Sequence, residues 1–283
     1  MAPIPNHPAP EGLPRWEARY RRKQAHRGRG LADLESRAGP VCVEIDARLA
    51  RRDVVRVLEL GCGYAIALLD LAARYGPRVE TFGVNLRAED GQQAVLRREA
   101  AERDLDVAAR PQLLPTLVHA DIARGLPLPA DTFDVVVSQV AWRYFGNKVG
   151  VLREVVRVLR EDGVGLIDAD EFERKLPPEY GRLVEIWEGG RLVPFGEYAA
   201  RHGLAFVPTP AGHALRIGKA RGFGDDLVGC VEIDTRAIDP RFDGIKCVYR
   251  RRDDAPDDAQ DRGASPGDAT TPSAASVSIA SSE

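Results

Sequence analysis

Residues 54–65 have the sequence V-V-R-V-L-E-L-G-C-G-Y-A, and this stretch decides the fold class. The β-branched and leucine side chains of its first half predict a buried strand that ends at Leu60. The two glycines that follow predict a tight turn, and the mainly apolar segment 64–75 predicts a helix directly after it. Strand, glycine turn and helix together begin a βαβ unit, in which the helix N-terminus offers unpaired N–H groups to a ligand.

The same alternation of strands and helices continues along the chain. Further strands are predicted at 79–84, 113–119, 133–138 and 164–167. A polar-faced helix is predicted at 89–103, and an amphipathic helix that begins near Val151 and is ended by Gly163. This order indicates a parallel sheet with right-handed crossovers, so the sequence predicts a doubly wound α/β fold.

Three regions are expected from the composition of the chain. Residues 1–50 form an N-terminal arm and a cap helix after Pro40, and residues 51–252 form the main domain. Residues 253–283 are acidic and poor in large apolar side chains, so they predict a disordered tail. Inside the main domain, a helix is expected at 195–202 and strands at 214–217 and 245–250.

Overall composition excludes several classes of protein. Hydrophobic residues make up 44% of the 283 residues, which is ordinary for a globular protein. The net charge of −3 gives no general attraction to nucleic acid or to an anionic membrane. No apolar run approaches the ~20 residues that span a bilayer, and the N-terminus does not resemble a secretory signal, so we expect a cytoplasmic protein without membrane partners. The four cysteines form no C-x-x-C pair or metal-ligand spacing, and no metal is expected.

Ligands of an open α/β sheet bind beyond the carboxyl ends of its strands, so the loops at those ends are the candidate binding segments. In the first loop, Ile66 stands where a dinucleotide-binding loop has a small residue, and no Lys-Ser/Thr pair follows as in a phosphate-binding P-loop. What remains is an acid two residues before Gly-x-Gly. The glycines could also do no more than turn the strand into the helix. In the next two loops, Asn85 could bond ribose hydroxyls and Asp121 an adenine amino group.

Five blocks taken in order resemble the class I S-adenosylmethionine-dependent methyltransferases, in the superfamily that acts on small molecules. These blocks are E-L-G-C-G-Y-A (59–65), G-V-N-L (83–86), H-A-D-I (119–122), L-P-L-P-A-D-T-F-D-V-V-V-S (126–138) and L-R-E-V-V-R-V-L-R-E-D-G-V (152–164). The resemblance covers roughly residues 51–170. It implies a Rossmann-like, mostly parallel seven-stranded sheet whose last strand is antiparallel, with 245–250 as the candidate for that strand. It also implies that segment 172–212 covers the acceptor pocket.

The resemblance implies S-adenosylmethionine as the cofactor and assigns its contacts. The methionine portion would lie against the loop after the first strand, the ribose against the end of the second and the adenine against the end of the third. The residues assigned in this way are Glu59, Gly61, Cys62, Gly63, Asn85, Leu86, Asp121, Ile122, Ser138 and Gln139. Two of the family's positions differ here: Ala65 replaces the third glycine, and Asn85 replaces an acid, which removes a charge-assisted hydrogen bond.

Methyl transfer is an in-line displacement that positioning alone can accelerate, so no motif names a general base. The region after the fourth strand is the best place to search, but the histidine of many relatives is replaced there by Arg143 or Tyr144. Tyr144, Asp170 and His202 are the candidates for a catalytic role. Trp142 is expected to pack in the core, and the other acids after the fifth strand, Asp168 among them, are expected to be solvated.

Three alternatives to a small-molecule methyltransferase stay open. The basic arm at 15–29, with its interleaved aromatic residues, could bind RNA phosphates and make the chain a nucleic-acid methyltransferase. The departures at Ala65 and Asn85 would also suit a protein that binds the cofactor without turnover. A nicotinamide-dependent oxidoreductase is disfavoured by Ile66. The sequence does not indicate the oligomeric state.

Overall fold

A computed structural model of the chain describes residues 29–86, 92–169, 184–220, 222–235 and 245–254. Its helices are α2 (Leu31–Ala38), α3 (Val41–Leu49), α4 (Ile66–Tyr75), α5 (Gln93–Glu102), α6 (Lys148–Val158) and α7 (Phe195–Arg201). Its strands are β1 (Val55–Leu60), β2 (Val79–Asn85), β3 (Thr116–His119), β4 (Phe133–Ser138), β5 (Leu159–Asp168), β6 (Val184–Glu188), β7 (Arg191–Pro194), β8 (Ala205–Thr209), β9 (Gly212–Ile217), β10 (Leu227–Asp234) and β11 (Ile245–Arg251). The basic arm up to residue 28, Asp170 and all but the first two residues of the acidic tail lie outside the described residues.

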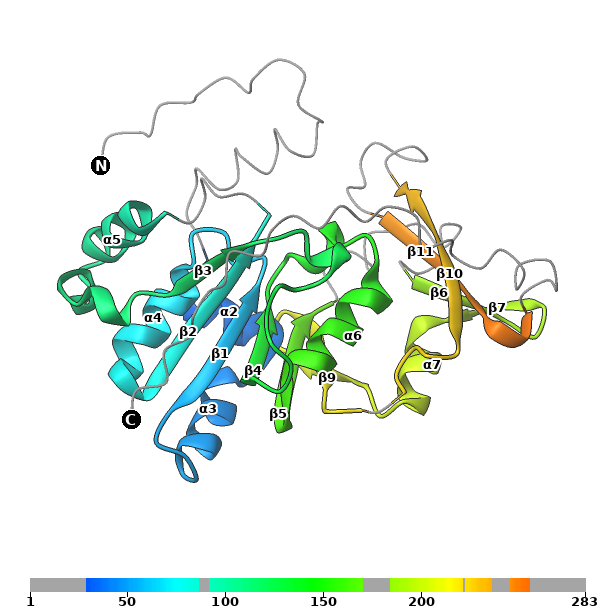
Figure 1. Ribbon diagram of the computed structural model, residues 1–283, viewed down its shortest axis with the longest axis horizontal. Helices are drawn as coiled ribbons and strands as arrows, with labels where there is room; N and C mark the ends of the chain where they lie inside the picture. The colour runs from blue at the N-terminus through cyan, green and yellow to red at the C-terminus, as the bar shows by residue number, and fades with distance from the viewer. Residues whose placement is uncertain (1–28, 87–91, 170–183, 221, 236–244, 255–283) are drawn as a thin grey trace, which may run out of the picture.

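The central layer is a seven-stranded sheet with the strand order β3-β2-β1-β4-β5-β9-β8 (Figure 1). The first five strands in this order run parallel, and β9 is antiparallel to both of its neighbours. The predicted doubly wound α/β fold is therefore confirmed. The strand order reverses between β1 and β4, so the carboxyl ends of these two strands mark the switch point where ligands bind in such sheets.

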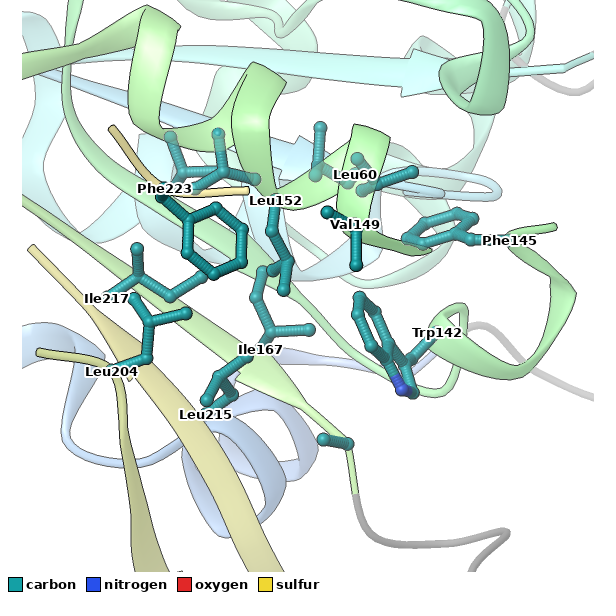
Figure 2. Close-up of a cluster of buried hydrophobic side chains, with 14 of the residues drawn as sticks. Leu60, Trp142, Phe145, Val149, Leu152, Ile167, Leu204, Leu215, Ile217 and Phe223 are labelled. Carbon is teal, nitrogen blue, oxygen red and sulfur yellow. The ribbon is translucent and has the colours of Figure 1, made fainter. Parts of the chain in front are cut away.

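Helices cover both faces of this sheet. Along β1, Val55 and Val57 contribute to a core cluster with α2, α3, α4 and α5, whereas Leu58 and Leu60 contribute to a second cluster with α6 and α7. The period of two along the strand explains this division, because successive side chains point to opposite faces. Figure 2 shows part of the second cluster, which is continuous from the sheet into α6 and the segment after α7.

The assignment of the antiparallel strand from the sequence was wrong. Segment 245–250 forms β11, which lies in a separate four-stranded sheet with the order β10-β11-β6-β7. The antiparallel strand of the main sheet is β9 instead, and its residue Ile217 pairs with Gly165 of β5. A Cβ on Gly165 would lie 3.2 Å from the Ile217 Cβ, so the glycine permits this close pairing. Segment 172–212 accordingly supplies β6, β7 and α7, and its last strand, β8, joins the main sheet.

The end of α6 also differs from the prediction. The helix ends at Val158, and Gly163 lies inside β5. Leu159 is already extended, fully buried and paired with Phe133 of β4, so burial of its side chain in the sheet ends the helix before the glycine is reached. A helix follows Pro40, as the sequence predicts, and forms α3, whereas α2 ahead of it was not predicted.

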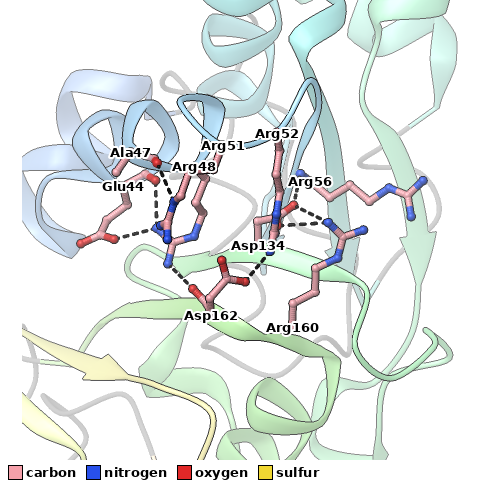
Figure 3. Close-up of polar contacts among 9 residues, drawn as sticks. All are labelled: Glu44, Ala47, Arg48, Arg51, Arg52, Arg56, Asp134, Arg160 and Asp162. Atoms are coloured by element: carbon pink, nitrogen blue, oxygen red, sulfur yellow. Dashed lines mark hydrogen bonds and ion pairs between the residues drawn. The ribbon is translucent and has the colours of Figure 1, made fainter.

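An ion-pair network joins the amino ends of the strands to α3 (Figure 3). Asp134 of β4 is fully buried and pairs with Arg52 and Arg160, and it also accepts a hydrogen bond from the Arg56 backbone N–H at 2.8 Å. A buried carboxylate requires such partners, because its charge would otherwise be desolvated without compensation. The network lies at the edge of the sheet opposite to the switch point, so we assign it to stability.

Candidate functional site

The loop between β1 and α4 is held in a conformation that favours glycine. Gly61, Gly63 and Ala65 have φ angles of 70°, 54° and 56°, all in the left-handed region. A Cβ on Gly61 would lie only 2.5 Å from the Cβ of Ala141, in the turn after β4. Gly61 is therefore required both by its backbone angle and by the close approach of this turn. Ala65, at the position where the resemblance implies a third glycine, is also left-handed, a conformation that costs an alanine more than a glycine.

Asn85 at the end of β2 is bound to this loop through both of its polar side-chain atoms. Its Oδ1 accepts a hydrogen bond from the Gly63 N–H at 2.8 Å, and its Nδ2 donates to the Gly63 carbonyl at 2.6 Å. The side chain is buried, at 3% exposure. An aspartate could accept the first bond but could not donate the second. The asparagine at this position therefore matches the backbone that it faces.

Glu59 and Gln139 form a buried polar pair at the switch point. The Gln139 amide nitrogen donates to Glu59 Oε1 at 3.0 Å, and Glu59 is 1% exposed. Burial raises the pKa of the Glu59 carboxyl to about 7, although the hydrogen bond from Gln139 opposes this shift. Among the described residues, Glu59 Oε2 and Gln139 Oε1 are buried acceptors without a hydrogen-bond partner. Such acceptors are uncommon in folded proteins, and they indicate a place where a ligand can donate hydrogen bonds.

The turn after β4 is strained and is tied to both neighbouring strands. Val140 has a φ of 61°, which is unfavourable for a β-branched residue. Its backbone N–H donates to Asp168 Oδ2 of β5 at 3.0 Å, and the Ser138 hydroxyl donates to the Leu60 carbonyl of β1 at 3.0 Å. Asp168 is 5% exposed and lies 3.6 Å from the Arg37 guanidinium. The expectation that Asp168 is a solvated loop acid was therefore wrong, and Arg37 was missed because α2 was not predicted.

The loops after β2 and β3 lie beside this arrangement. The Ala120 N–H donates to the Asn85 carbonyl at 2.9 Å, which holds the start of the β3 loop against the end of β2. Asp121 is half-exposed, accepts a hydrogen bond from the Ala123 N–H at 3.0 Å and lies 3.3 Å from the Arg124 guanidinium. Ile122 is buried. Leu86 is 60% exposed, which is unusual for a leucine at the end of a buried strand.

Of the three candidates for a catalytic role, the structure describes Tyr144 and His202, which have different neighbours. Tyr144 lies in the short 3₁₀ helix η6 (Trp142–Tyr144), where the Arg143 guanidinium carbon is 5.6 Å from the centre of its ring. His202 stacks on Tyr198, with ring centres 4.4 Å apart, at the end of α7 that leads into the first residues of β8. Asp170 lies outside the described residues. Trp142 is buried against Phe145 and Val149, as Figure 2 shows, which confirms the expected packing role.

Residues 58–167 match a family whose description is methyltransferase domain. These residues include the second half of β1, all of β2 to β4, nearly all of β5, and the switch point described above. This match supports a methyltransferase domain within residues 58–167 of the chain. The family and the fold imply S-adenosylmethionine as the cofactor of this domain.

Individual relatives of the methyltransferase domain are distant. A glycine/sarcosine/dimethylglycine N-methyltransferase of Actinopolyspora halophila is 30% identical over 108 residues, which are 38% of this chain and 17% of that protein. The chain thus spans about one sixth of the length of this curated relative. A SAM-dependent methyltransferase from Aquifex aeolicus is 16% identical, with a TM-score of 0.40 over 66% of this chain and 96% of that one. The YcgJ protein from Bacillus subtilis is 20% identical, with a TM-score of 0.37 over 68% and 73% of the two chains.

Within the described residues, no helix has the length and hydrophobicity needed to cross a membrane.

Proposed function

We propose that this chain transfers a methyl group from S-adenosylmethionine to a small-molecule acceptor by in-line displacement. The observation that carries the proposal is the pair of buried acceptors, Glu59 Oε2 and Gln139 Oε1, which lack a partner among the described residues and lie beside the glycine loop of a methyltransferase domain. An ammonium group with three N–H donors is a chemically matched partner for a carboxylate and an amide oxygen. The methionine portion of the cofactor carries such a group.

The remaining contacts follow from the loops at the same edge. The glycine loop exposes backbone to the methionine portion, because side chains are absent at Gly61 and Gly63. Asp121 is exposed enough to accept a hydrogen bond from the adenine amino group, and the buried Ile122 next to it supplies an apolar contact. Asn85 keeps one lone pair on Oδ1 and one hydrogen on Nδ2 for the ribose, although both atoms already bind Gly63.

The cofactor, when bound, supplies a methyl group on a positively charged sulfur. The residues of the chain would bind and orient the cofactor. The strained turn at Val140 is held by the hydrogen bond to Asp168, which fixes the side of the site between the ends of β4 and β5. Correct orientation can lower the barrier by several kcal/mol without a general base. A base is needed only for an acceptor that must lose a proton, and Tyr144 and Asp170 are the candidates near this side of the site by their position in the sequence.

A small-molecule acceptor is supported by the relative from Actinopolyspora halophila, which carries glycine, sarcosine and dimethylglycine in its name. A nucleic-acid acceptor would depend on the basic arm at 15–29, nearly all of which lies outside the described residues. A protein that binds the cofactor without turnover is the remaining alternative. Measured methyl transfer to an acceptor would distinguish the proposed enzyme from this non-catalytic alternative.

The test is calorimetric titration of the purified chain with S-adenosylmethionine and, separately, with NAD⁺. We expect saturable binding of S-adenosylmethionine alone, weakened about tenfold or more by Asp121→Ala, since each lost hydrogen bond to a charged group costs about 1.5–3 kcal/mol. Asp106→Ala is the matched control, because Asp106 is also an exposed aspartate paired with a nearby arginine, Arg110. Transfer of labelled methyl to small amines, with an RNA oligonucleotide as a parallel acceptor, then identifies the acceptor class. No binding of S-adenosylmethionine at millimolar concentration would refute the proposal.

A further inference from the structure

The four-stranded sheet brings together three side chains that can bind a metal ion. Cys230 and Glu232 lie on the same face of β10, because they are two residues apart in a strand. Cys247 of β11 pairs directly with Glu232. The two sulfur atoms and a carboxylate oxygen all lie within 4.8 Å of one another. Cys230 and Cys247 are far apart in the sequence, so no spacing predicts this cluster.

The segment before α6 closes one side of the cluster. Cys247 Sγ lies 2.6 Å from the Gly146 carbonyl oxygen. A Cβ on Gly146 would lie 2.7 Å from Glu232 Oε2, so glycine lets the carboxylate approach the backbone here. Cys247 is buried, Cys230 is partly exposed and Glu232 is exposed, so the cluster is open to solvent on the side of Glu232.

The donor set is typical of one class of ion. Two thiolates and a carboxylate are ligands of Zn²⁺, whereas Mg²⁺ and Ca²⁺ prefer oxygen ligands alone. Zn–S bonds of about 2.3 Å in a tetrahedral site place the ligand atoms about 3.5–3.8 Å apart, so the cluster needs to contract only slightly. We propose that Cys230, Glu232 and Cys247 bind a divalent cation of the Zn²⁺ type, with a water molecule as the fourth ligand on the open side.

The surrounding charge is consistent with this ion. Three anionic ligands and a divalent cation leave one negative charge, and the Lys148 ammonium is fully buried next to the cluster. Lys148 donates to the carbonyls of Trp142 and Phe145, at 3.0 and 2.5 Å, which fixes its position.

A disulfide between the two cysteines is the main alternative, and the strand register disfavours it. Cys230 pairs with Tyr249, so Cys230 and Cys247 are diagonal neighbours. Diagonal positions of an antiparallel pair are about 7–8 Å apart, beyond the about 4.4–6.8 Å between Cα atoms that disulfides usually span. A metal ion between the sulfur atoms bridges the longer separation without moving the strands.

The test is metal analysis of the full chain purified under reducing conditions, followed by titration with Co²⁺ as a spectroscopic substitute for Zn²⁺. We expect one ion for each chain, a thiolate-to-cobalt charge-transfer band, and displacement of Co²⁺ by Zn²⁺. Glu232→Gln changes an exposed side chain, so it should leave the fold intact and weaken Zn²⁺ binding about tenfold or more in a chelator competition. Cys230→Ser leaves one thiolate ligand, so it should lower the charge-transfer intensity by about half or more.

Cys42→Ala is the control for the loss of a thiol, because Cys42 is a free cysteine in α3, outside the cluster. It should leave the Zn²⁺ affinity of the chain essentially unchanged. The proposal is overturned if the reduced chain shows no Co²⁺ charge-transfer band at micromolar metal, or if Glu232→Gln and Cys230→Ser bind Zn²⁺ as tightly as Cys42→Ala. A Cys230–Cys247 disulfide found by mass spectrometry in chain purified without oxygen would also overturn it.

Discussion

The side-chain amide of Asn85 forms two hydrogen bonds with the backbone of Gly63, one through each of its polar atoms. The bonds join the end of β2 to the glycine loop after β1, so they fix the loop in the conformation in which it would receive the cofactor. The methyltransferases that the sequence resembles have an acid at this position, and the sequence alone predicts only that its replacement loses a charge-assisted hydrogen bond to the ribose. In the structure, asparagine forms both bonds because its amide carries an acceptor and a donor, whereas an ionised carboxylate carries only acceptors.

This relationship predicts the effect of restoring the acid. Asn85→Asp removes the Nδ2 donor and places a buried carboxylate against the Gly63 carbonyl, so we expect the free energy of unfolding to fall by about 1–3 kcal/mol. Affinity for S-adenosylmethionine should fall because the loop loses its anchor. Chemical denaturation and calorimetry measure the two effects. Tighter binding of the cofactor by the Asn85→Asp variant would contradict this prediction. It would show that a carboxylate bonded to the ribose adds more affinity than the loss of the Asn85–Gly63 bonds removes.

Glu59 makes stability depend on pH in the direction opposite to that of most carboxylates. Its pKa is about 7 in the folded chain and near 4.5 when unfolded, so between these pH values the unfolded chain binds fewer protons. Stability therefore falls as pH rises from about 4.5 to 7, and the loss is complete above pH 7. We expect Glu59→Gln to be more stable than the unchanged chain at about pH 8, by up to about 3 kcal/mol, and equally stable at about pH 4.

Glu154 supplies the matched control for this experiment. The Arg157 guanidinium lowers the pKa of Glu154, so its stabilising effect is present at neutral pH and is lost as pH falls through its folded value. Glu154→Gln should thus reduce stability at about pH 7, the opposite sign to Glu59→Gln. Thermal unfolding between about pH 4 and pH 8 measures both variants. Equal behaviour of Glu59→Gln and the unchanged chain at the upper end of this range would contradict a buried, perturbed carboxyl.

Alanine substitutions at Gly61 and Gly76 can distinguish the cost of backbone strain from the cost of a steric clash. Both have positive φ angles, 70° and 58°, but a Cβ on Gly76 would meet nothing within 4 Å, whereas on Gly61 it would meet Ala141. Gly76→Ala should cost only the strain of its backbone angles, φ 58° and ψ −138°, which is about 1–3 kcal/mol. Gly61→Ala should cost more and displace the turn after β4, with about a tenfold or greater loss of cofactor affinity. Equal affinity of the two variants for S-adenosylmethionine would contradict the role of the close Gly61–Ala141 contact in cofactor binding.

The sequence predicts the parallel half of the sheet well, because each of those strands carries its own signal. The β-branched run of β4, F-D-V-V-V-S, is buried along its whole length, and its bounds were predicted to the residue. Local patterns also identified 214–217 and 245–250 as strands. They could not say which of these pairs with β5, because that choice depends on contacts between distant residues such as Gly165 and Ile217.

The same limit applies to the candidate site. Glycines and the residue types at strand ends are visible in the sequence, and the structure brings Glu59, Gly61, Asn85 and Gln139 to adjacent strand ends. The roles of Asp168 and Arg37 are not visible, because they depend on a strained turn and on a helix with no capping side chain. The cluster of Cys230, Glu232 and Cys247 is likewise a product of strand register rather than of spacing.

Asp134 tests whether the two edges of the sheet have separate roles. It is fully buried between Arg52 and Arg160, so removal of its carboxylate leaves two guanidinium groups without their main partner (Figure 3). We expect Asp134→Ala to lower the free energy of unfolding by about 3–5 kcal/mol.

Asp162→Ala is the control for Asp134→Ala, because Asp162 also pairs with Arg52 but is 39% exposed, and it should cost less than about 1 kcal/mol. Both variants should bind S-adenosylmethionine with unchanged affinity at temperatures where they are folded, because the network lies at the edge opposite to Glu59. Urea denaturation and calorimetry on the same samples measure stability and affinity together. A loss of affinity in folded Asp134→Ala would show that the amino edge of the sheet is coupled to the cofactor site through β4, which carries Asp134 and leads into the turn at Val140.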